Sequence, residues 1–275
     1  MARQPSLLSS LPQARPKDPA AGSFRPFEQE LTGRGFVCLA GVDEAGRGCL
    51  AGPVVAAAVI LPPVTPELLA ALSGVNDSKQ LTASQRDALF EKVLHACLSY
   101  GIGEASAAEV DQLNVLGATH LAMSRAVAQL SPSPDLLLID GNQPIPTPVL
   151  KAVWQLRSSS SQPSSQPSSQ LPAQKTIVKG DSLCLSIAAA SILAKVSRDR
   201  QLVRLAEQFP GYGLDEHKGY PTPTHKAAIA AMGPTPIHRL TFRGVRPEEG
   251  GEHASRGSSP SEGVLSLFGE LSDPS

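Results

Sequence analysis

Five short apolar segments limit what this chain can fold into. Two of them, residues 35–42 and 53–61, flank a glycine-rich turn, which predicts a pair of antiparallel strands. A third strand is expected at 99–105, a fourth at 135–140 and a fifth at 176–178. The fourth, DLLLID, is a short apolar run that ends in an acid, which is typical of a buried strand.

Helix signals stand between these segments. Thr82 is followed by Gln85, and Ser106 by Glu109, so both pairs match the capping box that begins a helix. Further helices are expected over two longer segments, residues 116–130 and 186–208. Because the first three strands are followed by helices that alternate with two more strands, the pattern predicts a mixed α/β fold.

Composition divides the chain into a folded body and three segments without a packing pattern. Residues 1–32 are rich in Pro, Ser and Ala, and we expect a mobile arm there. Residues 158–174 contain the low-complexity run SSSSQPSSQPSSQ, which predicts a flexible insertion inside the domain. Residues 247–275 are expected to form a disordered acidic tail. One domain of ordinary size, 33–246, remains.

Charge is unevenly distributed along the chain. The net charge of −1 argues weakly against a nucleic-acid partner. However, Lys and Arg outnumber Asp and Glu in 175–246, whereas acids dominate 247–275. This asymmetry is compatible with a body that binds phosphates, although an ordinary solvated surface explains it equally well.

The location of the protein is expected to be cytoplasmic. The four cysteines form no C-x-x-C pair, which favours free thiols in a reducing compartment over zinc or disulfides. No run of about 18 apolar residues is present, and the N-terminus lacks the apolar region of a signal peptide, so we expect no membrane span. Because no interface signal is visible, a monomer is expected.

Acidic residues at strand ends carry the first chemical signal. Asp43 and Glu44 follow an apolar run, Asp140 ends another, and Asp181 stands just before a helix. The ends of neighbouring strands are where sites assemble in α/β sheets. Carboxylate oxygens without His or Cys select hard cations such as Mg²⁺ or Mn²⁺. A structural alternative is that these acids cap turns or form ion pairs.

Such a cluster suits phosphodiester hydrolysis with two divalent cations, one activating water and one stabilising the leaving oxygen. The turn that follows, Gly46–Arg47–Gly48, lets the backbone approach a ligand closely and can sense a ribose 2′-hydroxyl. The alternative is a plain tight turn between strands. Tyr220, beside Lys218 and Gly219, can stack on a sugar or base, whereas Tyr212 is more typical of core packing.

Long motifs of this chain resemble one family. GVDEAGRGCLAGPVVAAAVIL, NDSKQLT, LLIDGN, KGDSLCLSIAAASILAKVSRDR and YGLDEHKGYPTPTH occur in the order found in bacterial ribonuclease HII, the type 2 ribonucleases H. The resemblance covers about 35–246. It implies a ribonuclease H-like fold, with a five-stranded mixed sheet flanked by helices. It also implies cleavage of the RNA strand of RNA–DNA hybrids and incision 5′ of single ribonucleotides in duplex DNA, leaving 3′-hydroxyl and 5′-phosphate ends.

The resemblance also assigns roles to residues. It implies that the four carboxylates bind the metals and that the turn Gly46–Gly48 contacts the ribonucleotide at the junction. Tyr220 would stack on the sugar of the next unit. Asn76, Ser78 and Lys79 would hold backbone phosphates. The implied role is removal of misincorporated ribonucleotides, which links the chain to DNA repair and replication.

Departures from the family pattern are few. Cys49 stands where the family usually has Pro, and we expect a slightly looser turn with activity retained. The type 3 enzymes usually carry a sizeable N-terminal domain and a fourth acid that is Glu. A short patternless arm and Asp181 therefore favour type 2.

The tail contains a small apolar cluster, Val264–Phe268. It resembles the peptide that bacterial replication proteins insert into the sliding clamp, although Val264 replaces the usual Gln. Leu265, Leu267 and Phe268 would be the docking side chains. A short helix that folds back on the body is the alternative.

The motifs disfavour two other functions. A DNA-directed nuclease or integrase on the same fold is disfavoured by the glycine turn and the Lys-Gly-Tyr motif, since both suit ribose sensing. A non-catalytic hybrid-binding module is disfavoured by four intact carboxylates, because a binder has no use for a costly acid cluster.

Overall fold

The computed structural model describes residues 27–75, 81–160 and 170–246. The five strands are β1 (Leu39–Ala45), β2 (Val54–Ile60), β3 (Ser99–Ala105), β4 (Leu136–Asp140) and β5 (Ala173–Ile177). The helices are α2 (Phe27–Gly33), α3 (Pro66–Ala71), α4 (Ala83–Ala96), α5 (Ala107–Val127), α6 (Thr147–Ser160), the 3₁₀ turn η2 (Gly180–Ser182), α7 (Leu185–Gln208), α8 (Leu214–His217) and α9 (Pro223–Met232).

The strands form one mixed sheet in the order β3-β2-β1-β4-β5. The first three strands pair antiparallel, and β4 and β5 extend the sheet in parallel from β1. The expected five-stranded mixed sheet is therefore confirmed. β1 lies at its centre, so both of its edges are paired with neighbouring strands.

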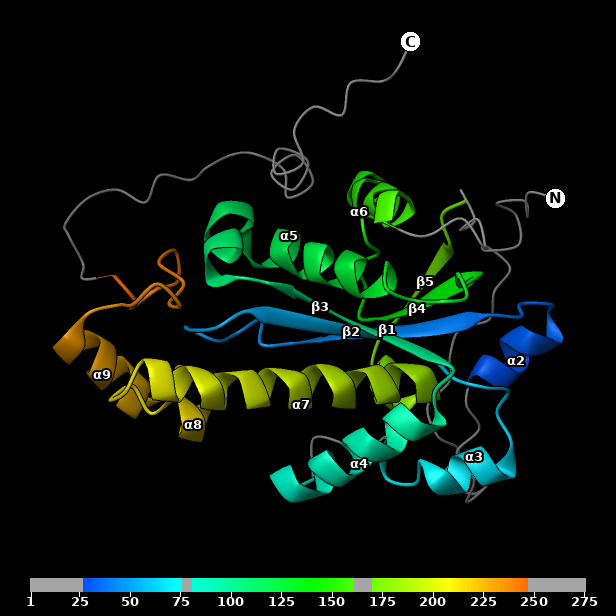
Figure 1. Cartoon of the computed structure of the whole chain (residues 1–275), viewed down its shortest axis with the longest axis horizontal. Coiled ribbons are helices and arrows are strands. Elements are labelled where there is room, and N and C mark those ends of the chain that lie inside the picture. The colour runs from blue at the N-terminus through cyan, green and yellow to red at the C-terminus, as the bar shows by residue number, and fades with distance from the viewer. Residues whose placement is uncertain (1–26, 76–80, 161–169, 247–275) are drawn as a thin grey trace, which may run out of the picture.

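Helices cover both faces of the sheet (Figure 1). One face packs against α5, with α6 beside that helix, and the other packs against α7, with α4 outside it. A large apolar cluster fills each interface. The short helices α8 and α9 lie beyond one end of the sheet with their own small core (Figure 1).

Both expected capping boxes are present. The Thr82 hydroxyl accepts from the Gln85 N–H at 3.3 Å, and the Gln85 side chain accepts from the Thr82 N–H at 2.8 Å. The Ser106 pair has the same reciprocal arrangement. The helix that begins there, α5, ends at Val127. It is kinked at Asn114, whose φ of 59° is not helical. The expected helix 116–130 corresponds to the part after this kink.

Three expectations about local structure were wrong. Phe27–Gly33 forms α2 instead of belonging to a mobile arm, and it buries Phe27 and Leu31. β1 begins at Leu39 rather than at residue 35 and continues through the acid pair to Ala45. β5 lies at Ala173–Ile177, so it begins inside the segment expected to be a flexible insertion.

Small residues let α7 approach the sheet. A Cβ on Gly41 of β1 would overlap the backbone at Ser186 of α7, so only glycine fits there. Trp154 of α6 is buried in the core that α6 shares with α5. In the described ranges, none of the helices combines the length and apolar character needed to cross a membrane.

Candidate active site

The pleat of β1 sends the two adjacent acids to opposite faces of the sheet. Val42 belongs to the core under α5, so Glu44, two residues further on, also faces α5. Asp43 faces α7, where Ser191 hydrogen-bonds to it. Asp140 ends β4, and Asp181 lies in η2 just before α7. Three separate segments therefore bring four carboxylates to one end of the central strands.

Burial makes these charges costly. Asp43 is only 6% exposed, and its pKa is raised well above the usual value by desolvation and by repulsion from Glu44 and Asp140. Desolvation also raises the pKa of Glu44, although Arg47 opposes that shift. A bound cation would offset both effects, because it favours the charged forms.

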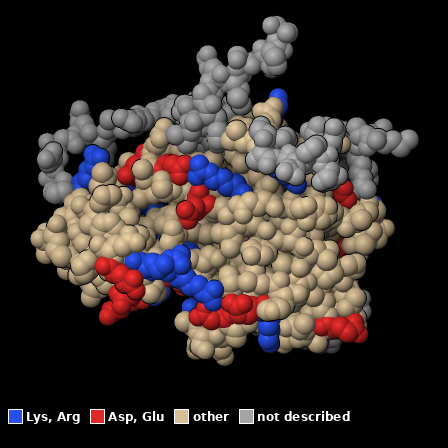
Figure 2. All heavy atoms as spheres, viewed as in Figure 1, with Lys and Arg blue, Asp and Glu red and all other residues tan. Residues whose placement is uncertain are grey.

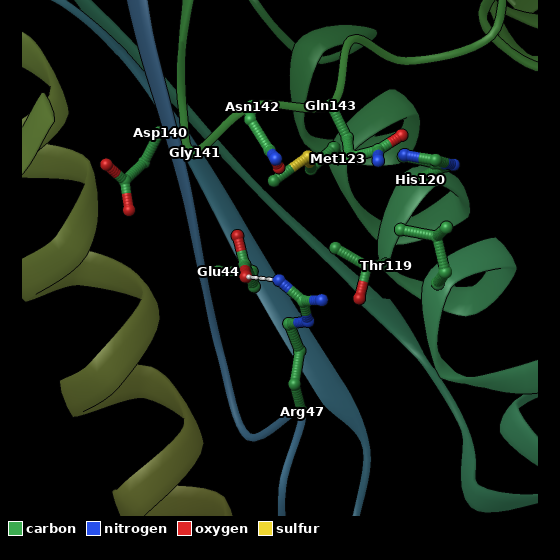
Figure 3. A pocket seen from close by; sticks show the side chains of 10 residues that line it. Glu44, Arg47, Thr119, His120, Met123, Asp140, Gly141, Asn142 and Gln143 are labelled. Carbon is green, nitrogen blue, oxygen red and sulfur yellow. Dashed lines mark hydrogen bonds and ion pairs between the residues drawn. The ribbon is translucent and has the colours of Figure 1, made fainter. Parts of the chain in front are cut away.

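Each carboxylate has protein partners in this structure. Arg47 Nη1 donates to Glu44 Oε1 at 3.0 Å, and the Gly180 N–H donates to Asp140 Oδ1 at 2.7 Å. Figure 3 shows the Asp140 carboxylate pointing away from the Glu44–Arg47 pair. Within the described residues, no three His, Cys, Asp or Glu side chains are already gathered as a metal-binding group. The oxygen donors and unbalanced charge fit a hard cation.

A small open pocket lies beside Glu44 on the α5 side (Figure 3). Its walls come from α5, from the turn after β4 and from Arg47, and the lining residues include Thr119, His120, Asn142 and Gln143. His120 is buried, which lowers its pKa to about 4, and among the described residues its Nδ1 has no hydrogen-bond partner. The pocket therefore combines acidic, basic and neutral polar groups beside the carboxylates.

The Gly46–Gly48 turn lies directly after β1. Gly46 has a φ of +92°, and a Cβ there would overlap the guanidinium of Arg198, so this position requires glycine. Within the described part of the chain, the N–H groups of Arg47 and Gly48 donate to no protein acceptor. These two donors are thus available to a ligand.

Cys49 follows this turn and packs inside the protein. Its side chain is fully buried, and its N–H donates to the Gly46 carbonyl at 3.3 Å. Proline lacks that N–H. The slightly looser turn expected from Cys49 stays a prediction.

Two fully buried arginines hold the carbonyl groups around the turn. Arg198 of α7 and Arg239 are both 0% exposed. Arg239 donates to the Arg47 carbonyl at 2.8 Å and twice to the Gly52 carbonyl, at 2.9 and 3.1 Å. Burial lowers the Arg239 pKa to about 10, so it remains a cation at neutral pH.

Arg198 joins the turn to the segment that carries Tyr220. Its guanidinium donates to the carbonyls of Ala51 and Pro53 at 3.0 Å each, and to that of Lys218 at 2.9 Å. The Leu50 N–H also donates to the Gly219 carbonyl at 2.8 Å. The turn and the Lys-Gly-Tyr motif are therefore locked together through the backbone.

The two tyrosines differ as expected. Tyr212 is buried, and its hydroxyl donates to the Gly233 carbonyl at 2.6 Å. Tyr220 is 40% exposed, with Lys195 Nζ 5.4 Å from its ring centroid. Asn76, Ser78 and Lys79 lie outside the described residues, so their expected phosphate contacts stay a prediction. The tail residues Leu265, Leu267 and Phe268 are outside as well.

Sequence reasoning missed the residues that support the site. Arg198 stands four residues from Ala194 and from Leu202, both fully buried, so the helical period did indicate a buried position. Arg239 lies outside any helix or strand, in a segment with no such period. His120 lines the pocket, but its position in an apolar helix gave no sign of this.

A mixed five-stranded sheet with carboxylates at the ends of its central strands, beside a glycine turn, defines the class of nucleases with the ribonuclease H-like fold. Comparison with known proteins narrows this class. The family model described as Ribonuclease HII matches residues 40–245, and the chain belongs to that family. A ribonuclease HII of Syntrophotalea carbinolica is 52% identical over 208 residues, which cover 76% of this chain and 86% of that protein.

Solved structures agree. A ribonuclease H2 of Pyrococcus horikoshii matches with a TM-score of 0.57 at 26% identity, over 84% of this chain and 99% of that one. The ribonuclease HII in a complex with PCNA from Archaeoglobus fulgidus matches with a TM-score of 0.55 at 26% identity, over 77% and 98%. The chain is a ribonuclease H, a metal-dependent endonuclease that acts on RNA–DNA hybrids.

Proposed function

We propose that this enzyme also cuts duplex DNA on the 5′ side of a single embedded ribonucleotide, leaving 3′-hydroxyl and 5′-phosphate ends. One observation carries the proposal: the free N–H groups of Arg47 and Gly48 lie directly after the acid pair of β1. Donors at that place can bind the oxygens of a ribose next to the bond that is cut. The biological role would be removal of ribonucleotides from cytoplasmic DNA by a monomer.

Asp43, Glu44, Asp140 and Asp181 would hold two divalent cations, Mg²⁺ or Mn²⁺. When bound, these ions supply an activated water and neutralise charge on the leaving oxygen. Asp43 and Asp140 share the α7 face of the sheet, whereas Glu44 approaches from the α5 face. Burial raises the pKa of Glu44, and the Arg47 guanidinium opposes that rise because it favours the charged carboxylate.

Substrate orientation would come from the two locked segments. Tyr220 would stack on the sugar that follows the ribonucleotide, and Asn76, Ser78 and Lys79 would hold phosphates further along. Because Arg198 and Leu50 tie the Tyr220 segment to the turn, the ribose and the neighbouring sugar would be read at a fixed spacing. A change in that spacing would misplace the phosphate.

The test uses a labelled DNA duplex with one ribonucleotide, compared with the same duplex carrying a 2′-O-methyl group and with all-DNA. We expect a cut 5′ of the ribonucleotide with Mg²⁺ or Mn²⁺, none with chelator, and none in either control duplex. Cleavage of a continuous RNA–DNA hybrid without cleavage at the single ribonucleotide would overturn the proposal.

The tail would add a partner. We propose that Leu265, Leu267 and Phe268 dock on the replication sliding clamp; the archaeal relative solved with PCNA supports this choice. Binding would be weak, because the segment must become ordered to dock. Deletion of 264–268 should abolish clamp affinity in a titration, and unchanged affinity would rule out the peptide.

A further inference from the structure

Three histidines pack together behind Tyr220. His217 ends α8, His225 lies in α9, and His238 follows α9 in the chain. His225 is 0% and His238 is 1% exposed. The rings of His217 and His225 stack with centroids 4.3 Å apart, and those of His225 and His238 are 5.4 Å apart. Neither the proposed metal site nor the proposed ribose contact uses these side chains.

Backbone partners fix the protonation of His238. The Thr235 N–H, which can only donate, points at His238 Nδ1 at 3.0 Å. Nδ1 must therefore carry a lone pair, and the single proton of this ring lies on Nε2. That Nε2 lies 3.2 Å from Nε2 of His225, so His238 is the donor in this contact.

The same reasoning fixes His225 independently. Its Nδ1 lies 3.0 Å from the Tyr220 carbonyl, which can only accept, so Nδ1 carries the proton. Its Nε2 is then free to accept from His238. A proton on both nitrogens of His225 would place two N–H groups opposite each other across the Nε2–Nε2 contact. Both rings are neutral, and the donors run in one direction from Thr235 to Tyr220.

The two ends of this chain of bonds reach the two substrate segments. His238 forms an antiparallel bridge with Ala51, and the next residue, Arg239, donates its N–H to the Leu50 carbonyl at 2.8 Å. Both contacts lie in the loop that continues the Gly46–Gly48 turn. At the other end, the Tyr220 carbonyl accepts from His225 and from the Thr222 N–H.

We propose that His238 and His225 form a neutral hydrogen-bond relay that positions Tyr220 relative to the Gly46–Gly48 turn. They are positioning residues and touch no substrate. The inference rests on the proposed function insofar as Tyr220 contacts the substrate. Desolvation favours the neutral rings, because burial lowers the pKa of His225 and lowers that of His238 to about 4.

The first test needs no substrate. Two-bond ¹H–¹⁵N spectra of the full-length protein distinguish the two neutral tautomers of each histidine ring and the imidazolium. At neutral pH we expect the proton of His238 on Nε2 and that of His225 on Nδ1. The opposite tautomer at either ring, or an imidazolium, would overturn the relay, whatever the enzyme cuts.

The second test measures positioning. His225→Leu should lower kcat/KM on the single-ribonucleotide duplex about tenfold, the equivalent of one lost buried hydrogen bond. His225→Asn, which can place an amide donor near the Nδ1 position, should recover most of that loss. His95→Leu, at an exposed position on α4, should be neutral. Equal activity of folded His225→Leu and wild type would overturn the proposal.

A double mutant separates positioning from stability. If the relay acts through Tyr220, His225→Leu should add no further loss of kcat/KM in a Tyr220→Ala background. An undiminished tenfold loss there would show that the histidines act elsewhere. If the wild-type enzyme does not cut at single ribonucleotides, only the proposed function is refuted. The tautomer measurement decides the histidine relay separately, because it uses no substrate.

Discussion

Asp43 is a residue whose charge is unfavourable for folding. It pairs in the middle of the sheet, opposite Ala57 of β2, and Glu44 lies opposite Ala56. Such positions normally hold apolar side chains, and the raised pKa of Asp43 reflects the cost of the charge. The sequence placed the acid pair after the strand because charges usually end an apolar run. In the structure, the strand continues through both acids.

This cost predicts a gain in stability for Asp43→Asn without metal. A carboxyl whose pKa is raised on folding destabilises the native state when it is ionised, so the penalty appears as pH rises above its unfolded value, about 3.9. At neutral pH with chelator, the variant should be more stable by about 1 kcal/mol. Urea unfolding at pH 7 and at pH 3.5 measures this. A variant that is less stable at pH 7 would contradict it.

Arg47 pairs with Glu44, the carboxylate that we propose as a cation ligand. Because the Arg47 guanidinium and a cation would compete for the charge of Glu44, Arg47→Ala should bind Mn²⁺ about two- to fivefold more tightly without substrate, as expected for a partly exposed pair. Calorimetric titration measures the affinity. Arg200→Ala, which removes an exposed ion pair with Asp87 on the far side of α7, serves as the control. Weaker Mn²⁺ binding by Arg47→Ala would count against the competition.

At the scale of elements, patterned segments could be predicted and edge segments could not. The two capping boxes and the buried strand β2 follow from short-range rules, and the structure has them where the sequence placed them. β5 was misplaced because it is an edge strand, AQKTI, with only Ile177 buried. α2 was missed because its seven residues are too few for a helical period to stand out.

The sequence also could not predict which residues hold the backbone of the glycine turn in place. It depends on Arg239, which is 192 residues from the Arg47 carbonyl that it holds. No local pattern reports a contact at that separation. The four carboxylates, by contrast, each stood at the end of a recognisable element, and long motifs carried their assignment.

Arg239→Lys tests this support. Lysine keeps the charge but cannot hold two carbonyls with a planar fork. We expect the free energy of unfolding to fall by about 2–3 kcal/mol and kcat/KM on the single-ribonucleotide duplex to fall at least tenfold. Arg243→Lys, at an exposed site nearby, should change neither. Full activity of Arg239→Lys would mean that the turn holds its conformation unaided.

At the scale of the molecule, no extended basic field covers the face seen in Figure 2. Figure 2 shows basic and acidic side chains interspersed on the viewed face instead of one extended basic field. The excess of Lys and Arg in 175–246 therefore does not form a single patch on that face. Arg198 and Arg239 belong to this excess of basic residues, and both are buried and donate hydrogen bonds to backbone carbonyls.

The layered architecture explains how distant segments meet. β1 contributes two acids, and the parallel pairing of β4 brings Asp140 to the same end of the sheet. α7 begins shortly after Asp181 and carries Arg198, whose guanidinium donates to the carbonyls of Ala51 and Pro53 beyond the glycine turn. One helix thus follows one of the four acids and supports the backbone beside the glycine turn.

The most direct measurement compares wild type and Asp43→Asn on one labelled duplex carrying a single ribonucleotide, with Mg²⁺, in parallel binding and cleavage assays. If the carboxylates of β1, β4 and η2 form the hydrolytic centre, the variant should bind the duplex with nearly wild-type affinity and cut it at least about a thousandfold more slowly. Cleavage by Asp43→Asn at a wild-type rate would contradict that claim.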